Sequence, residues 1–226
     1  MRQWGIALLA VAATALSGCI RESRIALPSD LLAGTQEVEL TGMGLGRSGD
    51  FMLAGSEGQF TRGADQLSLG NATLVSNTGG GSFRHAGLDG TCRYREREIN
   101  VGIVSLPERP FSYHCLLGRG GMPVGELVIE EERGNTGSLL SKRGRRGFMT
   151  FDGISYTIRS IHRDQGGGLT AATALGYRFD ADGRPVGAVD LNAENKTIFA
   201  PRSGAAREAV FAGSMALSIL WDSATL

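Results

Sequence analysis

Cysteine and histidine, which often bind metals or take part in catalysis, are rare in this 226-residue chain. The cysteines are Cys19, Cys92 and Cys115, and the histidines are His85, His114 and His162. A zinc site needs three or four converging ligands, and this spacing does not suggest one, so no metal and no cofactor are predicted. The motifs of serine hydrolases, zinc proteases, dithiol oxidoreductases and phosphate-binding loops do not occur. His162 with Asp164 could form a catalytic dyad, but polar residues this close more often belong to a turn.

Carboxylates give no clearer indication of catalysis. A glycoside hydrolase uses two of them at a defined separation. Asp89, Glu126 and Asp152 are candidates, but their sequence positions do not give that separation. No catalytic residue is therefore predicted, and an enzyme is only an alternative hypothesis.

Cys19 ends a segment with the plan of a secretory signal. Arg2 supplies a positive charge, and residues 5–16 form an apolar run. This run is shorter than the roughly 20 residues of a membrane-spanning helix. It closes with LSGC at residues 16–19, which resembles the lipobox of bacterial lipoproteins.

The resemblance implies that residues 1–18 are a signal peptide and that Cys19 carries a thioether-linked diacylglycerol, usually with a third chain on the new amino terminus. Two or more acyl chains, at about 0.8 kcal/mol per buried methylene, hold a protein on a membrane. Ile20 follows the cysteine, whereas an Asp there resembles an inner-membrane retention signal in enteric-type bacteria. An outer-membrane protein facing the periplasm is expected, with display on the cell surface as an alternative.

Cys92 and Cys115 would then lie in an oxidising compartment, where two remaining cysteines favour a disulfide. The loop of about 24 residues that they close gives about 3.4 kcal/mol of stabilisation in the chain-entropy model. In a strand, Cys92 and Tyr94 face one side while Arg93, Arg95 and Arg97 face the other, where the arginines would be exposed to solvent or form a binding strip.

Composition and patterning indicate an all-β protein. The chain has 34 glycines, 42% hydrophobic residues and a net charge of zero, which gives no electrostatic case for nucleic-acid binding. Short apolar runs separated by Gly, Asn, Asp and Ser extend over residues 36–202. They predict a mainly antiparallel sandwich or barrel-like domain. Residues 180–185, DADGRP, predict a hairpin turn.

The two ends of this domain have a different pattern. Residues 19–35 lack a sustained period and are predicted to be a lipidated tether. Residues 203–222 are rich in alanine and large apolar residues, which predicts one C-terminal helix packed on the β body. Ser203 could cap that helix. Arg207 and Glu208 within it argue against a membrane span.

An internal duplication is also predicted, because residues 81–129 and 146–191 share residue types at similar spacing. The matches include Phe83 with Phe148, Tyr113 with Tyr177, and Pro-Val-Gly at 123–125 with Pro-Val-Gly at 185–187. The alternative is chance, since hairpin turns everywhere favour Asp, Gly and Pro.

A charged connector joins the two stretches. It is acidic at residues 130–132 and basic at Lys142, Arg143, Arg145 and Arg146. Such connectors are usually only solvated. The functional alternative is that the basic residues contact anionic lipid headgroups or other phosphates.

The leading hypothesis is a lipid-anchored, non-enzymatic envelope protein that binds an envelope protein or a lipid. The alternatives are an envelope hydrolase with dispersed catalytic residues and a surface-displayed adhesion or ligand-binding lipoprotein. A deep cleft at a histidine would favour the enzyme, and a shallow groove or an unpaired sheet edge would favour a protein partner. A closed apolar lumen would favour lipid carriage.

Overall fold

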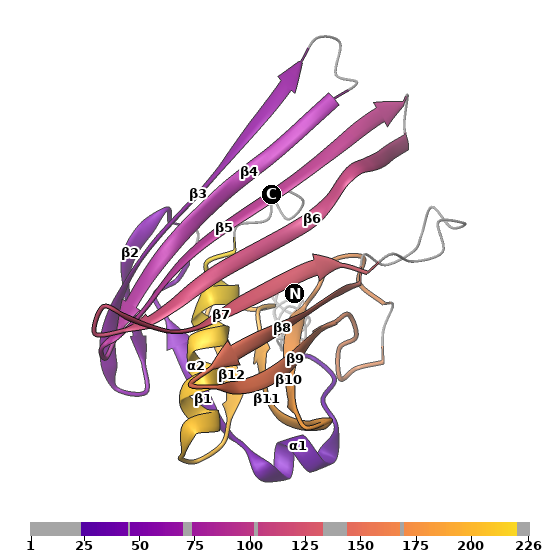
Figure 1. Ribbon diagram of the computed structural model, residues 1–226. Helices are drawn as coiled ribbons and strands as arrows, with labels where there is room; N and C mark the ends of the chain where they lie inside the picture. The colour runs from indigo at the N-terminus through magenta and orange to yellow at the C-terminus, as the bar shows by residue number, and fades with distance from the viewer. Residues whose placement is uncertain are drawn as a thin grey trace, which may run out of the picture.

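A computed structural model describes most of the chain after residue 23. The described residues are 24–44, 46–69, 74–101, 104–132, 144–167 and 170–220. Cys19, Lys142 and Arg143 lie outside them. Twelve antiparallel strands form a closed barrel, and a C-terminal helix follows the last strand (Figure 1). The predicted fold, all-β with one C-terminal helix, is confirmed.

The strands are β1 (Gln36–Thr41), β2 (Ser48–Leu53), β3 (Ser56–Leu69), β4 (Leu74–His85), β5 (Leu88–Val101), β6 (Val104–Arg119), β7 (Met122–Glu131), β8 (Arg145–Phe151), β9 (Ile154–Ile161), β10 (Gly176–Ala181), β11 (Arg184–Asp190) and β12 (Lys196–Ala200). The helices are α1 (Ser29–Gly34) and α2 (Ala205–Ser218).

Each strand pairs with the next along the chain, and β1 closes the barrel by pairing with β12. This is an up-and-down barrel. Its two ends differ in their connections. At one end, called the turn end, two-residue turns join β2 to β3, β4 to β5, β6 to β7, β8 to β9 and β10 to β11. The opposite end, called the loop end, carries the connections from β1 to β2, β3 to β4, β5 to β6, β7 to β8, β9 to β10 and β11 to β12.

The turn-end hairpins have positive φ at both central residues, as type I′ turns require. The predicted turn is confirmed at Asp182 (φ 50°) and Gly183 (φ 75°). Ala54 (φ 51°) and Ala86 (φ 48°) occupy the first turn position in two other hairpins. An alanine in this left-handed region is strained by roughly 1 kcal/mol, because its Cβ approaches the following carbonyl oxygen.

Side chains alternate between a buried inner face and a polar outer face. On β5, Cys92 and Tyr94 are buried, whereas Arg93 and Arg95 are exposed, as predicted. The apolar face of the barrel therefore points into its lumen.

Helix α2 fills that lumen. Every residue from 209 to 219 is buried, which is the pattern of a helix enclosed on all sides. The Tyr113 hydroxyl of β6 donates a hydrogen bond to the Ala216 carbonyl. The ring of Phe179, on β10, lies against the bare backbone of Gly213. The predicted helix thus packs on the inner face of the closed sheet.

The beginning of α2 differs from the prediction. Its N-cap residue is Gly204, not Ser203, and no side chain caps it. Gly204 has φ 91°, a conformation that favours glycine.

Strands β3 to β6 are 12 to 16 residues long and continue past the loop end as a four-stranded extension (Figure 1). Strand β2 pairs with β3 only as far as Thr61, and β7 pairs with β6 only from Ser112. Among the described residues, the outer edges of the extension at 63–69 and 104–111 therefore have no partner strand.

Residues 24–35 are not an extended tether, so this part of the prediction is wrong. Ile25 is fully buried, forms a β-bridge with Asp164, and donates its backbone N–H to Asp190 Oδ2 at 3.0 Å. Leu31 of α1 is buried in the same apolar cluster, against the outer face of the barrel. Sequence periodicity missed this segment because only single residues anchor it.

The duplication of residues 81–129 and 146–191 stays a prediction. Both stretches form successive hairpins, but so does every part of an up-and-down barrel. The two Pro-Val-Gly segments do correspond, because Val124 and Val186 each form a bulge at the same position. The match of Phe83 with Phe148 is wrong, since Phe83 is buried and Phe148 is 48% exposed.

Candidate functional site

The barrel mouth at the loop end holds a cavity of about 200 Å³ around the C-terminal end of α2. Three cations line it: Arg62, Arg145 and Lys196. Arg62 donates hydrogen bonds to the Ser218 carbonyl at 3.2 Å and to the Gly46 carbonyl at 2.9 Å. Cations are favourable here because the last carbonyls of a helix carry partial negative charge.

Burial raises the free-energy cost of keeping Arg62 and Lys196 charged. It lowers the pKa of Arg62 below its ordinary value. Burial is also the largest cause of the lowered pKa of Lys196; Arg62 lowers it further, while Asp190 and Glu194 oppose the change. Lys196 donates to backbone carbonyls, including that of Leu191 at 3.3 Å. The three cations therefore lie at the barrel mouth, beside the C-terminal end of α2.

Arg145 belongs to this interior cluster and not to the predicted basic surface. It is buried, its Nη1 donates to the Tyr177 hydroxyl at 3.4 Å, and its guanidinium lies 3.9 Å from the ring centroid of Phe111. Its neighbour Arg146 is exposed on the outer face. Of the predicted headgroup contacts, only Arg146 is therefore a described surface residue.

His162 is the histidine closest to a catalytic arrangement. Its Nε2 lies 2.9 Å from Ser160 Oγ and its Nδ1 lies 3.0 Å from the Ala171 carbonyl oxygen, so neither contact is to Asp164. Ser160 Oγ also accepts the backbone N–H of Arg145 at 2.8 Å. Neither Ser160 nor His162 lines the cavity at the barrel mouth. The geometry fits a structural latch between β8, β9 and the following loop.

The other histidines have structural contacts. His85 is buried, stacks on Phe51 with ring centroids 5.7 Å apart, and hydrogen-bonds to the Leu53 carbonyl. His114 pairs with Glu126 at 2.9 Å on the outer face.

Asp152, another candidate carboxylate, lies in an ion-pair cluster at the turn end. Arg119 contacts Asp152 at 2.9 Å and Glu208 at 2.7 Å, which ties two hairpins to the first turn of α2. The hydrogen bond to Asp152 is the main reason that the pKa of Arg119 is raised. Glu126 contacts His114 and Asp152 contacts Arg119, an arrangement that supports structure.

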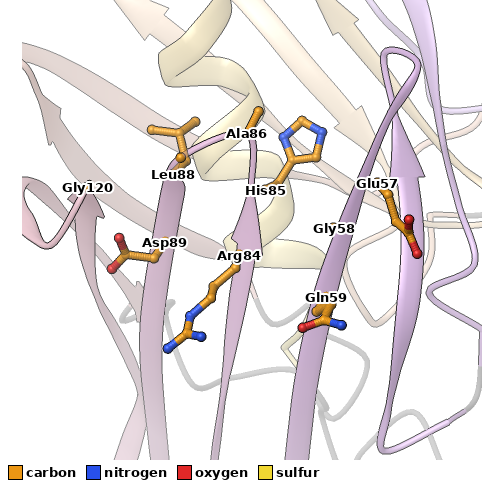
Figure 2. Close-up of a pocket in the computed structure, with 10 residues that line it drawn as sticks. Glu57, Gly58, Gln59, Arg84, His85, Ala86, Leu88, Asp89 and Gly120 are labelled. Atoms are coloured by element: carbon orange, nitrogen blue, oxygen red, sulfur yellow. The ribbon is translucent and has the colours of Figure 1, made fainter.

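A shallow groove, larger than the cavity at the barrel mouth, runs over the outer face of β2 to β5 and reaches Gly120 in the turn after β6. Figure 2 shows the part of it nearest the turn end. It consists of two adjoining cavities of about 480 and 510 Å³, both lined by Gln59, Arg84 and Asp89. These side chains lie in one row across neighbouring strands. Sequence reasoning missed the groove because three hairpins contribute to it.

The predicted disulfide is confirmed. Cys92 and Cys115 face each other directly on β5 and β6, with Cα atoms 4.0 Å apart. The bond encloses residues 93–114, which include the parts of β5 and β6 that leave the barrel. It therefore links β5 and β6 covalently where the extension begins.

Among the described residues, no helix combines the length and apolar character needed to cross a membrane. The same part of the chain holds no group of three or more His, Cys, Asp or Glu placed to bind a metal ion. Comparisons with protein-family models, curated proteins and solved structures give no match.

Proposed function

We propose that the protein is a lipid-anchored, non-enzymatic interaction module, held by Cys19 at the periplasmic face of the bacterial outer membrane. The signal segment and the lipobox-like LSGC at residues 16–19 support the anchor. The confirmed disulfide is consistent with export, because such bonds persist in oxidising compartments.

The observation that carries the proposal is the combination of a filled barrel and an open sheet. Helix α2 occupies the lumen, so carriage of a lipid inside the barrel is disfavoured. Binding must then use the outer surface. The extension of β3 to β6 offers backbone hydrogen-bonding groups along two edges that have no partner strand in the part of the chain that the structure describes.

The two edges are not equivalent. The edge at residues 104–111 contains Pro107 and Pro110, and proline cannot donate to a neighbouring strand. The edge at residues 63–69 contains no proline. This edge could therefore receive an extended segment of an envelope protein by β-strand addition.

Site-specific photocrosslinking in living cells tests this function. A crosslinking residue would replace Asp65, which is exposed on the β3 edge. We expect one discrete adduct with an envelope protein. The control replaces Glu39, which is exposed on β1 opposite Thr197 of β12 and should give no such adduct. Equal, diffuse labelling at both positions would contradict an interaction at the edge.

The anchor needs a separate test. Mass spectrometry of the protein from cell membranes should find acyl chains on Cys19. A Cys19→Ala variant should appear in the soluble envelope fraction. An unmodified Cys19 thiol on freely soluble wild-type protein would refute the anchor.

An envelope hydrolase is the second candidate, on the single observation that Ser160 Oγ lies 2.9 Å from His162 Nε2. An activated serine reacts with fluorophosphonate probes. Labelling that is lost in Ser160→Ala would support the hydrolase, whereas no labelling of the wild type would support the structural latch.

A further inference from the structure

Three arginines stand side by side on the outer face of the barrel near the loop end. The register places Arg146 of β8 opposite Arg159 of β9, and Arg159 opposite Arg178 of β10. Like charges directly opposite each other destabilise a sheet. Arg178 pairs with Asp180 at 2.8 Å, but Arg146 and Arg159 have no ion-pair partner within the described residues. The fold thus maintains a repulsive pair that a bound anion would relieve.

A groove of about 360 Å³ lies at this arginine pair. Its lining residues are Val128, Glu130, Glu132, Arg146, Gly147, Phe148, Thr157 and Arg159. A side chain at Gly147 would collide with the Val128 carbonyl, so only glycine allows β7 and β8 to approach this closely here. Phe148, 48% exposed, adds an apolar surface beside the charges.

The groove places two acids beside its two cations. Glu130 lies directly opposite Arg146, on the side away from Arg159. The Cβ atoms of two residues in such a pair are about 5 Å apart. A simple anion would be attracted by the arginines and repelled by Glu130 and Glu132. A ligand with a phosphate and an ammonium group would satisfy both pairs.

Phosphoethanolamine has these two groups. A guanidinium binds phosphate oxygens through two parallel hydrogen bonds. A primary ammonium carries three N–H donors for carboxylates, as the ammonium of lysine does. The quaternary ammonium of phosphocholine has no N–H donor, so the glutamates should distinguish the two headgroups.

The course of the N-terminal segment puts a bilayer near this groove. Ile25 is fixed to Asp164, and the Ala26 N–H donates to the Arg163 carbonyl, so the chain leaves the barrel at the loop end. Arg163 is about 13 Å along the chain from Arg159. From Arg24 to Cys19 the chain spans at most about 18 Å. A lipidated Cys19 would keep this wall close to the membrane surface.

We propose that the groove between Arg146, Arg159, Glu130 and Glu132 binds the phosphoethanolamine headgroup of the membrane lipids around the anchor. Its placement at the membrane rests on the proposed lipid anchor. The barrel is then held with its β7 to β9 wall toward the bilayer, and the turn-end groove points away from it.

Binding of the mature chain with Cys19→Ser to lipid nanodiscs tests the site without the contribution of acyl chains. Three compositions would be compared: phosphatidylcholine alone, and phosphatidylcholine with an equal part of phosphatidylethanolamine or of phosphatidylglycerol. We expect the strongest binding to the phosphatidylethanolamine discs and competition by soluble O-phosphoethanolamine. Arg146→Ala with Arg159→Ala should weaken this binding by at least about tenfold, because charge-assisted hydrogen bonds are lost.

Two further variants sharpen the test. Glu130→Gln with Glu132→Gln should abolish the preference for phosphatidylethanolamine over phosphatidylcholine and increase binding to phosphatidylglycerol. The control, Arg93→Ala with Arg95→Ala, removes two exposed arginines from β5 and should leave the preference unchanged. Circular dichroism melts would verify that every variant is folded.

Strongest binding to phosphatidylglycerol, or an equal loss in the β5 control, would overturn the headgroup site, because either result indicates attraction without recognition. The anchor fails independently. An unmodified Cys19 with an intact phosphatidylethanolamine preference would refute the proposed anchor and support the groove. An acylated Cys19 with no preference would refute the groove alone.

Discussion

Replacing Gly213 with alanine tests whether α2 lies inside the barrel. In an exposed helix this change stabilises by about 1 kcal/mol, because glycine has the poorer helix propensity. In the lumen, the added Cβ would lie 2.5 Å from Phe179 Cε1 and 3.1 Å from Met149 Sδ. Both neighbours are fully buried among other core side chains. Overpacking of this kind costs about 1 to 3 kcal/mol.

The net expectation for Gly213→Ala is a loss of up to about 2 kcal/mol in the free energy of unfolding. The measurement is urea denaturation followed by circular dichroism, with the slope compared between variants. Combining the change with Phe179→Leu should recover part of the loss, because the shorter side chain frees space for the new methyl group. A double-mutant cycle isolates that coupling.

The sign of the change in stability caused by Gly213→Ala decides whether α2 lies in the lumen. Ala205→Gly, at the exposed first residue of α2, serves as the control and should destabilise by no more than about 1 kcal/mol through propensity alone. If Gly213→Ala stabilised the protein, or if Phe179→Leu showed no coupling to it, the helix would not be packed against β10 in the lumen.

Three other changes have defined outcomes. Replacing Cys92 and Cys115 together with serine should lower the free energy of unfolding by about 3.4 kcal/mol, and mass analysis of the wild type should show a two-proton increase on reduction. Ala86→Asn should raise it by roughly 0.5 to 1 kcal/mol, since asparagine tolerates the positive φ better, and an unchanged melting temperature would contradict that turn geometry. Burial, and to a lesser extent nearby Tyr177, raises the pKa of the Tyr113 phenol well above its ordinary value of 10.0. The unfolded chain therefore releases this proton first, so stability should fall as the pH rises above 10, and Tyr113→Phe should reduce that fall in alkaline denaturation curves.

Local chemistry explains why the strands and the disulfide could be predicted. Hairpin turns need residues that accept positive φ, and Asp182-Gly183 shows this in the sequence itself. Alternation along β5 placed Cys92 inside and Arg93 outside. Barrel and sandwich have the same alternation, however. Closure depends on the pairing of β1 with β12, which no local pattern encodes.

The candidate sites were harder to predict because they depend on the register between strands and on which face of its strand each residue occupies. Arg145 and Arg146 are adjacent in a basic stretch, yet one points into the barrel mouth and the other to the outside, since successive residues of a strand face opposite sides. The approach of Arg159 to Arg146 depends on the pairing of β8 with β9. A sequence shows charges along the chain, whereas both grooves collect residues across it.

The width of the barrel explains why the binding sites proposed above lie on its outer wall. Side chains alone can fill a barrel of about eight strands, and wider barrels leave interior space. With twelve strands, this barrel needs other material in its lumen. Helix α2 supplies it, with the fully buried Val210, Met215 and Ala216 facing the surrounding wall. A hollow barrel of the same size could have carried an apolar ligand inside. By filling the lumen with its own helix, the chain converts that space into core, and for this reason the proposed binding sites are the outer groove and the sheet edge of the extension.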